Sequence, residues 1–135
     1  KRQTLGSELD LSEGLGVRLR ELSDALDCFI LHKGRITTVT APGQRIYGMN
    51  AGHSYAATAG SGDVLSGILG ATLAQVDAAE AAAETIIMEI LHAAAIHQHA
   101  AAIAAHTPDG FGLCSASQIA AAVPQAIARL LVMQR

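Results

Sequence analysis

The apolar positions of the chain recur with two different periods. Between Leu11 and Leu26 the leucines stand three and four residues apart with charged residues between them, which predicts an amphipathic helix with Ser12 as its N-cap. The next segment, Cys28–His32, is a short apolar run that is typical of a strand buried on both faces in a parallel sheet. A helix followed by such a strand indicates an α/β fold. Residues 1–10 lack a periodic pattern and are predicted to be a loop.

Two short β-rich segments follow and flank a turn sequence. Ile36–Thr40 and Arg45–Tyr47 are separated by Ala41-Pro42-Gly43-Gln44, in which the proline and the glycine favour a tight turn. We therefore expect a β-hairpin. The stretch from Met49 to Thr58 contains glycine and no periodic pattern, so it is expected to be a flexible loop.

The second half of the chain has the periodicity of helices. The helix after Asp63 has a broad apolar face made of Val64, Leu65, Ile68, Leu69 and Leu73. Gly67 and Gly70 lower its helix propensity, so we expect another element to approach closely there. A long helix is expected from about Ala79 to His106, either continuous or broken once, and Thr107-Pro108-Asp109-Gly110 ends it.

The C-terminal segment, Ser115–Arg135, is expected to be helical as well. It begins with Ser115-x-x-Gln118, which fits a capping box. Pro124 is expected to start a second short helix, because proline is favoured in the first turn of a helix and disfavoured inside one. The apolar face of this segment is interpreted as a packing surface and consists of Ile127, Leu130 and Leu131.

The composition is that of one globular domain or of a piece of a larger one. The chain has 135 residues, of which half are apolar, and a formal net charge of −3. Because no run of Lys or Arg is present, nothing favours nucleic acid or an anionic membrane as a partner. There is neither a signal peptide nor an uncharged run of membrane-spanning length, so the cytoplasm is the expected location. The chain opens on Lys1 rather than on Met, and we interpret it as a fragment.

A loop of small residues leads directly into a helix at Thr58-Ala59-Gly60-Ser61-Gly62-Asp63. The first N–H groups of a helix are unpaired and the helix dipole adds positive potential, so this position favours an anion. Gly60 and Gly62 would allow a ligand to approach the backbone closely. Asp63 has two possible roles, either as a helix cap or as a base that takes a proton from a hydroxyl attacking a bound phosphate.

Lys33 follows the predicted buried strand. The carboxyl ends of the strands in an open α/β sheet form the edge at which ligands bind, and an ammonium group there would suit a nucleotide phosphate. The alternative is a solvated lysine in an ordinary Lys-Gly turn. Periodicity alone leaves both interpretations open.

Several histidines share the predicted long helix. His92, His99 and His106 are spaced seven residues apart, and His97 lies between two of them. Side chains seven residues apart are separated by about 10 Å along a helix, which is too far for one metal ion to bind them together. We interpret the histidines as a core stripe or an interface stripe, and an interface would make the protein a homo-oligomer.

The run Thr58–Gln75 resembles the anion-hole and catalytic-aspartate signature of the ribokinase-like superfamily. More narrowly, it resembles the ADP/ATP-dependent NAD(P)H-hydrate dehydratases, in which Gly-Thr-Gly-Asp-Val-Leu-x-Gly occupies this place. The order of the elements, ending in Ala-Ser-Gln-Ile-Ala-Ala-Ala-Val-Pro-Gln-Ala-Ile, is also similar to the C-terminal half of that family. The resemblance implies that residues 1–135 are the C-terminal part of one three-layer ribokinase-like domain, with a β-hairpin and alanine-rich covering helices.

By this resemblance the whole protein would repair the hydrated, damaged form of NADH or NADPH. The hydroxyl of the hydrate would be phosphorylated by ADP or ATP and then eliminated as phosphate, with Mg²⁺ bridging the phosphates. Asp63 corresponds to the catalytic base that also contacts the substrate, and Gly60, Ser61 and Gly62 correspond to the anion hole. The nucleotide-binding positions of the family correspond to Gly62 and to Lys33, Gly34, Arg35, Ile36 and Thr37.

The chain departs from the family pattern in a few places. Ser61 replaces the usual threonine, Ala59 replaces a common glycine, and Gly52-His53 stands where Gly-Asn is frequent. The glycine-rich substrate segments and the His-Pro-Gly-Glu motif of the family are absent from this sequence. These 135 residues alone are therefore expected to show little or no dehydratase activity.

Two other functions stay open at this point. A small-molecule kinase of the same superfamily, of the thiazole or hydroxymethylpyrimidine type, would share Gly-x-Gly-Asp, although the Lys-Gly-x-x-Thr segment and the Val-Leu-x-Gly continuation favour the dehydratase. A non-catalytic oligomerisation fragment would use the alanine-rich helices as an interface and Asp63 only as a cap.

Overall fold

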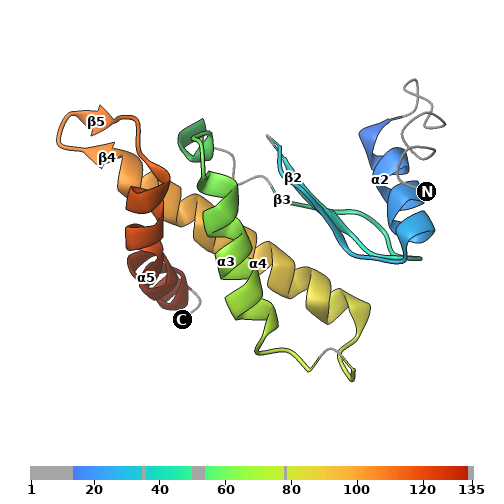
Figure 1. Ribbon diagram of the computed structural model, residues 1–135. Helices are drawn as coiled ribbons and strands as arrows, with labels where there is room; N and C mark the ends of the chain where they lie inside the picture. Colours follow the sequence, from blue (N-terminus) through green and yellow to red (C-terminus); the bar gives the residue numbers. More distant parts are fainter. Residues whose placement is uncertain (1–13, 35, 50–53, 78, 134–135) are drawn as a thin grey trace.

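The computed structural model describes residues 14–34, 36–49, 54–77 and 79–133. In this part of the chain a helix, a small sheet and a group of helices form successive layers (Figure 1). Helix α2 (Leu15–Leu26) covers one face of the sheet, and the long helix α4 (Ala83–Ala105) packs against the other. This layered arrangement confirms the predicted α/β class. The predicted loop 1–10, the predicted cap Ser12, Arg35 and Gly52-His53 lie outside the described residues.

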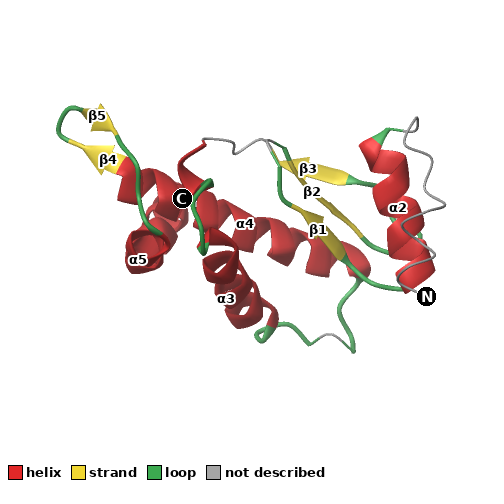
Figure 2. Cartoon of the chain, turned by 45° about the horizontal axis from the view of Figure 1, so that its top comes forward, coloured by secondary structure: helices red, strands yellow, loops and turns green. Residues whose placement is uncertain are grey.

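The sheet has three short antiparallel strands, β1 (Ile30–His32), β2 (Thr37–Thr40) and β3 (Tyr47–Met49), in that order (Figure 2). The prediction of a parallel sheet around Cys28–His32 is therefore wrong for the described strands. Only residues 33–36 separate β1 from β2, whereas a parallel connection needs a crossover of roughly a dozen residues or more. β1 is half-buried rather than fully buried because it lies at the edge of this sheet.

The predicted β-hairpin is confirmed, with β2 and β3 as its strands. The N–H of Gln44 donates to the carbonyl of Ala41 at 2.9 Å, and Gly43 has the positive φ, 68°, that this type of turn requires at its third residue. The N–H of Gly43 also donates to the carboxylate of Asp24 at 2.8 Å. The turn of the hairpin is thereby tied to the last turn of α2.

The rest of the described chain is helical apart from one small hairpin. A 3₁₀ helix, η1 (Ser54–Ala56), leads to α3 (Ser61–Leu73), which is followed by α4. The hairpin of β4 (His106–Thr107) and β5 (Gly110–Phe111) ends α4 at the predicted Thr-Pro-Asp-Gly sequence, and α5 (Ala116–Met133) follows it. Figure 2 shows α3 and α5 on the same side of the sheet as α4.

Two helices begin later than predicted. α2 begins at Leu15, with Gly14 as its N-cap, which is one turn after the predicted start. α4 begins at Ala83 and is unbroken. The residues before Ala83 form a separate turn, because the carbonyl of Asp77 accepts the N–H groups of Glu80 and Ala81. Asp77 thus holds the chain in a local turn that competes with the helix.

Helix α5 starts as predicted and continues further than predicted. The capping box is confirmed, because the N–H of Ser115 donates to the side-chain oxygen of Gln118 at 2.8 Å and the N–H of Gln118 donates to the Ser115 hydroxyl at 3.3 Å. Pro124 lies inside this continuous helix and does not start a second one. Its ring removes the hydrogen bond to the carbonyl of Ala120, and both residues are exposed, so water can satisfy that carbonyl.

The apolar face of α3 packs as predicted, but its glycines do not. Leu65 and Ile68 are buried, and the other apolar side chains of the face are partly buried. The expected close approach at Gly67 and Gly70 is wrong for the described residues, because a Cβ at either position would meet nothing within 4 Å. Both glycines are exposed because they lie away from the packed face.

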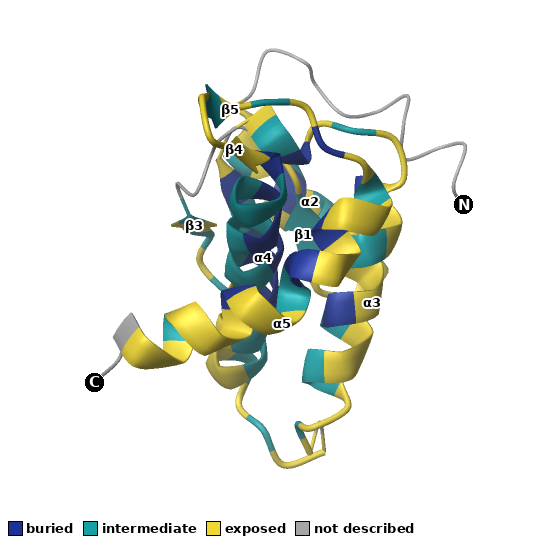
Figure 3. Ribbon diagram, turned by 90° about the vertical axis from the view of Figure 1, so that its left-hand side faces the viewer, coloured by how far each residue is buried: buried dark blue, intermediate teal, exposed yellow. Residues whose placement is uncertain are grey.

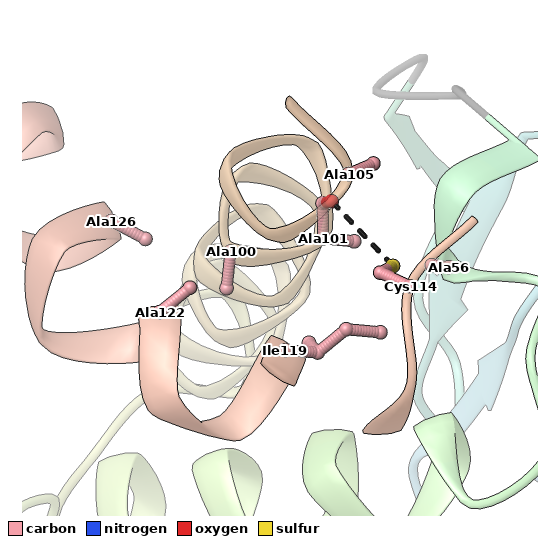
Figure 4. Close-up of a cluster of buried hydrophobic side chains, with 8 residues drawn as sticks. All are labelled: Ala56, Ala100, Ala101, Ala105, Cys114, Ile119, Ala122 and Ala126. Atoms are coloured by element: carbon pink, nitrogen blue, oxygen red, sulfur yellow. Dashed lines mark hydrogen bonds between the residues drawn. The ribbon is translucent and has the colours of Figure 1, made fainter. Parts of the chain in front are cut away.

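Buried side chains form two clusters along α4, one near its start and one near its end, and burial is concentrated along this helix in Figure 3. One cluster joins the sheet to α4 and contains Val39, Ala41, Ile87 and Ile90. The other joins α4 to α5 and is made mostly of alanine (Figure 4): Ala56, Ala100, Ala101, Ala105, Cys114, Ile119, Ala122 and Ala126. Short side chains allow close helix packing but bury little apolar area each. The larger residues of the clusters therefore contribute most of the hydrophobic stabilisation.

By length and composition alone, α4 could also cross a membrane, since it has 23 residues and a mean hydropathy of 1.2 over its most apolar window. Its contacts within the described chain are with α3, α5, η1 and the sheet. We therefore interpret α4 as the central core helix of this domain.

Replacement of Ile87 should destabilise the fold. Ile87 belongs to α4, and its side chain is fully buried against the sheet. Ile87→Ala is therefore expected to lower the free energy of unfolding by about 2–4 kcal/mol. Urea denaturation would measure the change. Met88→Ala is the matched control on the same turn, because Met88 is exposed and its loss should cost less than about 1 kcal/mol. Equal losses for the two variants would contradict the described packing.

Candidate functional site

The N-terminus of α3 is built around Gly60. This residue is the N-cap and adopts a left-handed conformation with φ of 79°. A Cβ at this position would lie 3.2 Å from the Cβ of Ala116, the first residue of α5. Glycine is therefore favoured by the positive φ, and the close approach of α5 leaves little room for a side chain. The next three residues, Ser61, Gly62 and Asp63, form the first turn of α3.

Few backbone donors are free at this helix terminus. The N–H of Ser61 donates to the carbonyl of Thr58 at 3.2 Å, and the N–H of Asp63 donates to the carbonyl of Gly60 at 3.1 Å. The N–H of Gly62 has no acceptor among the described residues. At the positive end of the helix dipole, this N–H is the backbone donor available to an anion.

Asp63 lies in the first turn of α3 and is exposed. The N-cap is Gly60, and the carboxylate of Asp63 makes no hydrogen bond or ion pair with the part of the chain that the structure describes. The carboxylate of Asp63 therefore does not cap α3 in this structure. It is open to a ligand, and its charge is favourable near the helix N-terminus.

Lys33 follows β1 and reaches the same loop. Its ammonium donates to the carbonyl of Ala56 and to the hydroxyl of Ser61, both at 3.2 Å. Partial burial lowers the pKa of Lys33. Lys33 is therefore not a freely solvated turn lysine, and its ammonium lies beside Ser61 at the start of α3. Its predicted role in binding a nucleotide stays a prediction.

The other residues of the predicted nucleotide segment lie along the connection from β1 to β2. Gly34 and Ile36 are exposed, and Thr37 is buried at the start of β2. Arg35 lies outside the described residues. The structure thus brings Lys33 into contact with Ser61 in the loop 58–63, whereas the described residues Gly34, Ile36 and Thr37 make no hydrogen bond to that loop.

His97 is a residue of this site that sequence reasoning missed. It is buried on α4, and its Nε2 lies 3.0 Å from both the hydroxyl oxygen and the carbonyl oxygen of Ser61. Burial lowers the pKa of His97, and the charge of Lys33 lowers it further, against the opposing effect of the bond to the Ser61 backbone. A signal was present in the sequence, because the residues three and four positions away on α4 are all small and buried: Ala93, Ala94, Ala100 and Ala101.

The other histidines of the predicted long helix make no hydrogen bond to Ser61, Lys33 or Asp63 in the described structure. His92 is exposed and lies 3.6 Å from the carboxylate of Glu89. His99 and His106 line a separate cavity of about 430 Å³ with Phe111 and Arg129. The expected core stripe is thus confirmed for His97 alone. No group of three or more residues able to hold a metal ion occurs among the described residues.

A second cavity lies next to residues 58–63, which we call the anion loop. It has a volume of about 600 Å³ and is lined by the segment 54–59, apart from Ala56, and by residues 111–114. The rings of Tyr55 and Phe111 stack beside it with their centroids 4.8 Å apart. The cavity has the size that small-molecule ligands occupy, and its lining reaches Ala59, one residue before the N-cap of α3. The α3 terminus itself offers the free N–H of Gly62 and the open carboxylate of Asp63, with the ammonium of Lys33 bound to Ser61. This set of groups is suited to binding a phosphate and to taking a proton from a nearby hydroxyl.

Comparison with protein families gives one matching model. The model described as NAD(P)H-hydrate dehydratase matches residues 10–122. This range includes Lys33, Ser61, Asp63 and His97, so the whole candidate site falls inside the match.

Curated relatives agree with this match. The bifunctional NAD(P)H-hydrate repair enzyme Nnr of Corynebacterium glutamicum is 42% identical over 120 residues, which cover 81% of this chain and 21% of that protein. The enzyme of the same name from Mycobacterium leprae is 44% identical over 113 residues, covering 82% of this chain and 22% of that protein. The ADP-dependent (S)-NAD(P)H-hydrate dehydratase of Neisseria meningitidis serogroup B is 42% identical over 57 residues, covering 42% of this chain and 19% of that protein.

The chain therefore spans about a fifth of the length of the curated relatives that it matches. No solved structure matches it significantly.

The buried His97 should make stability depend on pH. The pKa of His97 is lower in the folded protein than in the unfolded chain, where the pKa of histidine is about 6.5. As the pH falls, the unfolded state therefore binds the proton first. The stabilisation from neutral His97 is present above about pH 6.5 and declines below it, at no more than about 1.4 kcal/mol per pH unit. Urea denaturation at several pH values would show this decline, and His97→Gln should remove it.

The exposed His92 offers a matched control for this experiment. His92→Gln should leave the wild-type decline in place, because His92 has no contact with Ser61 or Lys33 in the described structure. A decline that persists in His97→Gln would assign the pH dependence to another group.

Proposed function

Because the chain belongs to the NAD(P)H-hydrate dehydratase family, we propose that its full-length protein dehydrates the hydrated form of NADH or NADPH, using ADP or ATP as co-substrate. One structural observation carries the proposal beyond family membership. The open carboxylate of Asp63 lies one residue from the free N–H of Gly62, on a loop that Lys33 contacts through Ser61. A base and the donors for a phosphate thus share one helix terminus.

The reaction needs a base beside a phosphate site. Asp63 would take the proton of the hydrate hydroxyl while the hydroxyl oxygen attacks the terminal phosphorus of the nucleotide. The N–H of Gly62 and the α3 dipole would stabilise the negative charge that develops on the phosphate oxygens. As the new bond to phosphorus forms, the bond from the terminal phosphorus to the rest of the nucleotide would break and release AMP or ADP. The carbon–oxygen bond would then break with its electron pair leaving on the phosphate, and the neighbouring ring carbon would lose a proton to solvent, which restores the ring double bond of NADH or NADPH.

The nucleotide would lie along the connection from β1 to β2. We assign its contacts to Gly62 and to the segment Lys33, Gly34, Arg35, Ile36 and Thr37. The ammonium of Lys33 donates to the hydroxyl of Ser61 and would pair with a nucleotide phosphate. Mg²⁺ is usually held by substrate phosphates and one or two carboxylates rather than by a protein cage, which agrees with the single open carboxylate of Asp63. Its role would be to neutralise phosphate charge.

The alternative functions are less well supported. The family model and the relatives name the hydrate dehydratase or repair activity and not a thiazole or hydroxymethylpyrimidine kinase. A non-catalytic fragment would need Asp63 as a cap, yet Gly60 is the N-cap of α3. We also propose a cytoplasmic location and self-association, the latter supported by the exposed apolar side chains of Ile127, Leu131 and Val132 on α5.

Loss of the Asp63 carboxylate should remove activity without unfolding the protein. In the full-length protein, Asp63→Asn is expected to lower kcat for NAD(P)H hydrate by about 10²–10⁴-fold, the range for a lost general base. Because Asp63 is exposed and makes no hydrogen bond in the described structure, the free energy of unfolding should fall by less than about 1 kcal/mol, the value of a charge near a helix N-terminus. Asp109→Asn, at an exposed turn, is the control. Unchanged turnover in Asp63→Asn would refute the proposed role.

The two glycines of the loop should respond differently to alanine. Gly62 is helical with open space around it, so Gly62→Ala should keep the fold but place a methyl group beside the free N–H and weaken ADP binding. Gly60→Ala should instead destabilise the protein by about 1–2 kcal/mol, because φ is positive and Ala116 is close. Calorimetric titration with ADP and thermal unfolding would measure both effects. Full ADP affinity in Gly62→Ala would place the nucleotide elsewhere.

A further inference from the structure

We propose that His97 is a positioning residue of the phosphate site: its imidazole fixes Ser61, so that the N–H of Gly62 and the carboxylate of Asp63 are held for one bound phosphate. The inference rests on the proposed function for the reaction that it serves. The contacts that carry it are independent of that function.

Ser61 is held from three sides. Its N–H donates to the carbonyl of Thr58 at 3.2 Å, and its hydroxyl accepts from the ammonium of Lys33 at 3.2 Å. The Nε2 of His97 lies 3.0 Å from both of its oxygens. Ser61 and His97 are each only 1% exposed, so no solvent competes for these bonds. The contacts come from the loop before α3, the end of β1 and the middle of α4.

The two distances at Nε2 select one tautomer of the neutral imidazole. The carbonyl oxygen of Ser61 can only accept a hydrogen bond, so a proton on Nε2 makes a favourable bond to it. A bare Nε2 would instead place its lone pair against those of the carbonyl oxygen at 3.0 Å. With the proton on Nε2, the hydrogen of the Ser61 hydroxyl is not needed by His97 or Lys33.

The charges around His97 favour this neutral ring. Among the described residues, Lys33 is the charged group that acts on the imidazole, and it shares the Ser61 hydroxyl with it. A protonated His97 would place a second positive charge beside that ammonium in a buried position. The neutral ring with a proton on Nε2 therefore satisfies Ser61 without repelling Lys33.

Fixing Ser61 fixes the residues that follow it. Gly62 and Asp63 are the next two residues of the same helical turn, so a shift of Ser61 moves the free N–H and the carboxylate together. Misplacement of a reacting group by about 1 Å can lower a rate by about 10²-fold. His97 touches neither nucleotide nor substrate in this account and acts through Ser61.

The test compares two substitutions of His97 in the full-length protein. His97→Leu removes the N–H and should lower kcat per folded molecule by about 10- to 100-fold, with a smaller change in KM for ADP. His97→Gln keeps an amide N–H near the position of Nε2 and should recover most of this loss. The matched control is His99→Gln on the same helix, because His99 has no contact with Ser61 in the described structure. If His97→Leu lowers only the folded fraction and leaves kcat per folded molecule unchanged, the residue is simply a packing residue and the proposal is wrong.

Nuclear magnetic resonance tests the same proposal without turnover. Long-range nitrogen–proton spectra of the wild-type protein should show His97 neutral, with its proton on Nε2, and a proton on Nδ1 would overturn the assignment. Inorganic phosphate should shift the amide signal of Gly62 in the wild type and in His97→Gln, and should do so much more weakly in His97→Leu. Equal shifts in all three proteins would contradict the positioning role. Absence of hydrate turnover by the wild type would refute the proposed function, while these spectra would still decide the role of His97.

Discussion

The burial of Ser61 at the start of α3 is the constraint on which the candidate site depends. A buried hydroxyl and a buried carbonyl are costly without partners, and Lys33 and His97 supply them from two elements that are distant in sequence. The bonds require β1, α3 and α4 to meet at one point. The position of the free N–H and of the open carboxylate is therefore a result of the fold around Ser61 and not of the loop sequence alone.

The fold supports this point from both sides. On one side, the Val39 and Ile87 cluster joins the sheet to α4 and sets where the end of β1 lies relative to that helix. On the other, α5 approaches Gly60 closely, because a Cβ at that position would lie 3.2 Å from the Cβ of Ala116. The packing of the two hydrophobic clusters thus determines where the polar groups of Lys33, Ser61 and His97 lie. Family membership is consistent with this arrangement, because the family match covers the sheet, α3, α4 and the start of α5.

The sequence predicted the local features well and the long-range ones poorly. The hairpin turn and the capping box depend on residues within a few positions of each other, and both were found as expected. The parallel sheet was wrong because apolar composition shows burial but not strand direction, which here follows from the short connection after Lys33. The continuous α5 was missed because the cost of Pro124 depends on whether the carbonyl that it frees can reach water.

The candidate site shows the same division. The anion loop and Asp63 could be proposed from one short motif. His97 could not, because it meets Ser61 across 36 residues of sequence and only the packing of α3 on α4 brings them together. Its alternation with the more exposed histidines of α4 concealed the one ring that is buried. A count of the small residues around each histidine would have separated them.

The alanine-rich contact between α4 and α5 has a consequence for how the sequence can change. Ala100, Ala101 and Ala105 have essentially no exposed surface, so even one added methylene group would push the two helices apart. Because Ala116 at the start of α5 lies against Gly60, such a displacement would be transmitted to the phosphate loop. Side-chain size at this interface is thereby coupled to the alignment of the reacting groups, and selection for activity would act on residues that never meet a ligand.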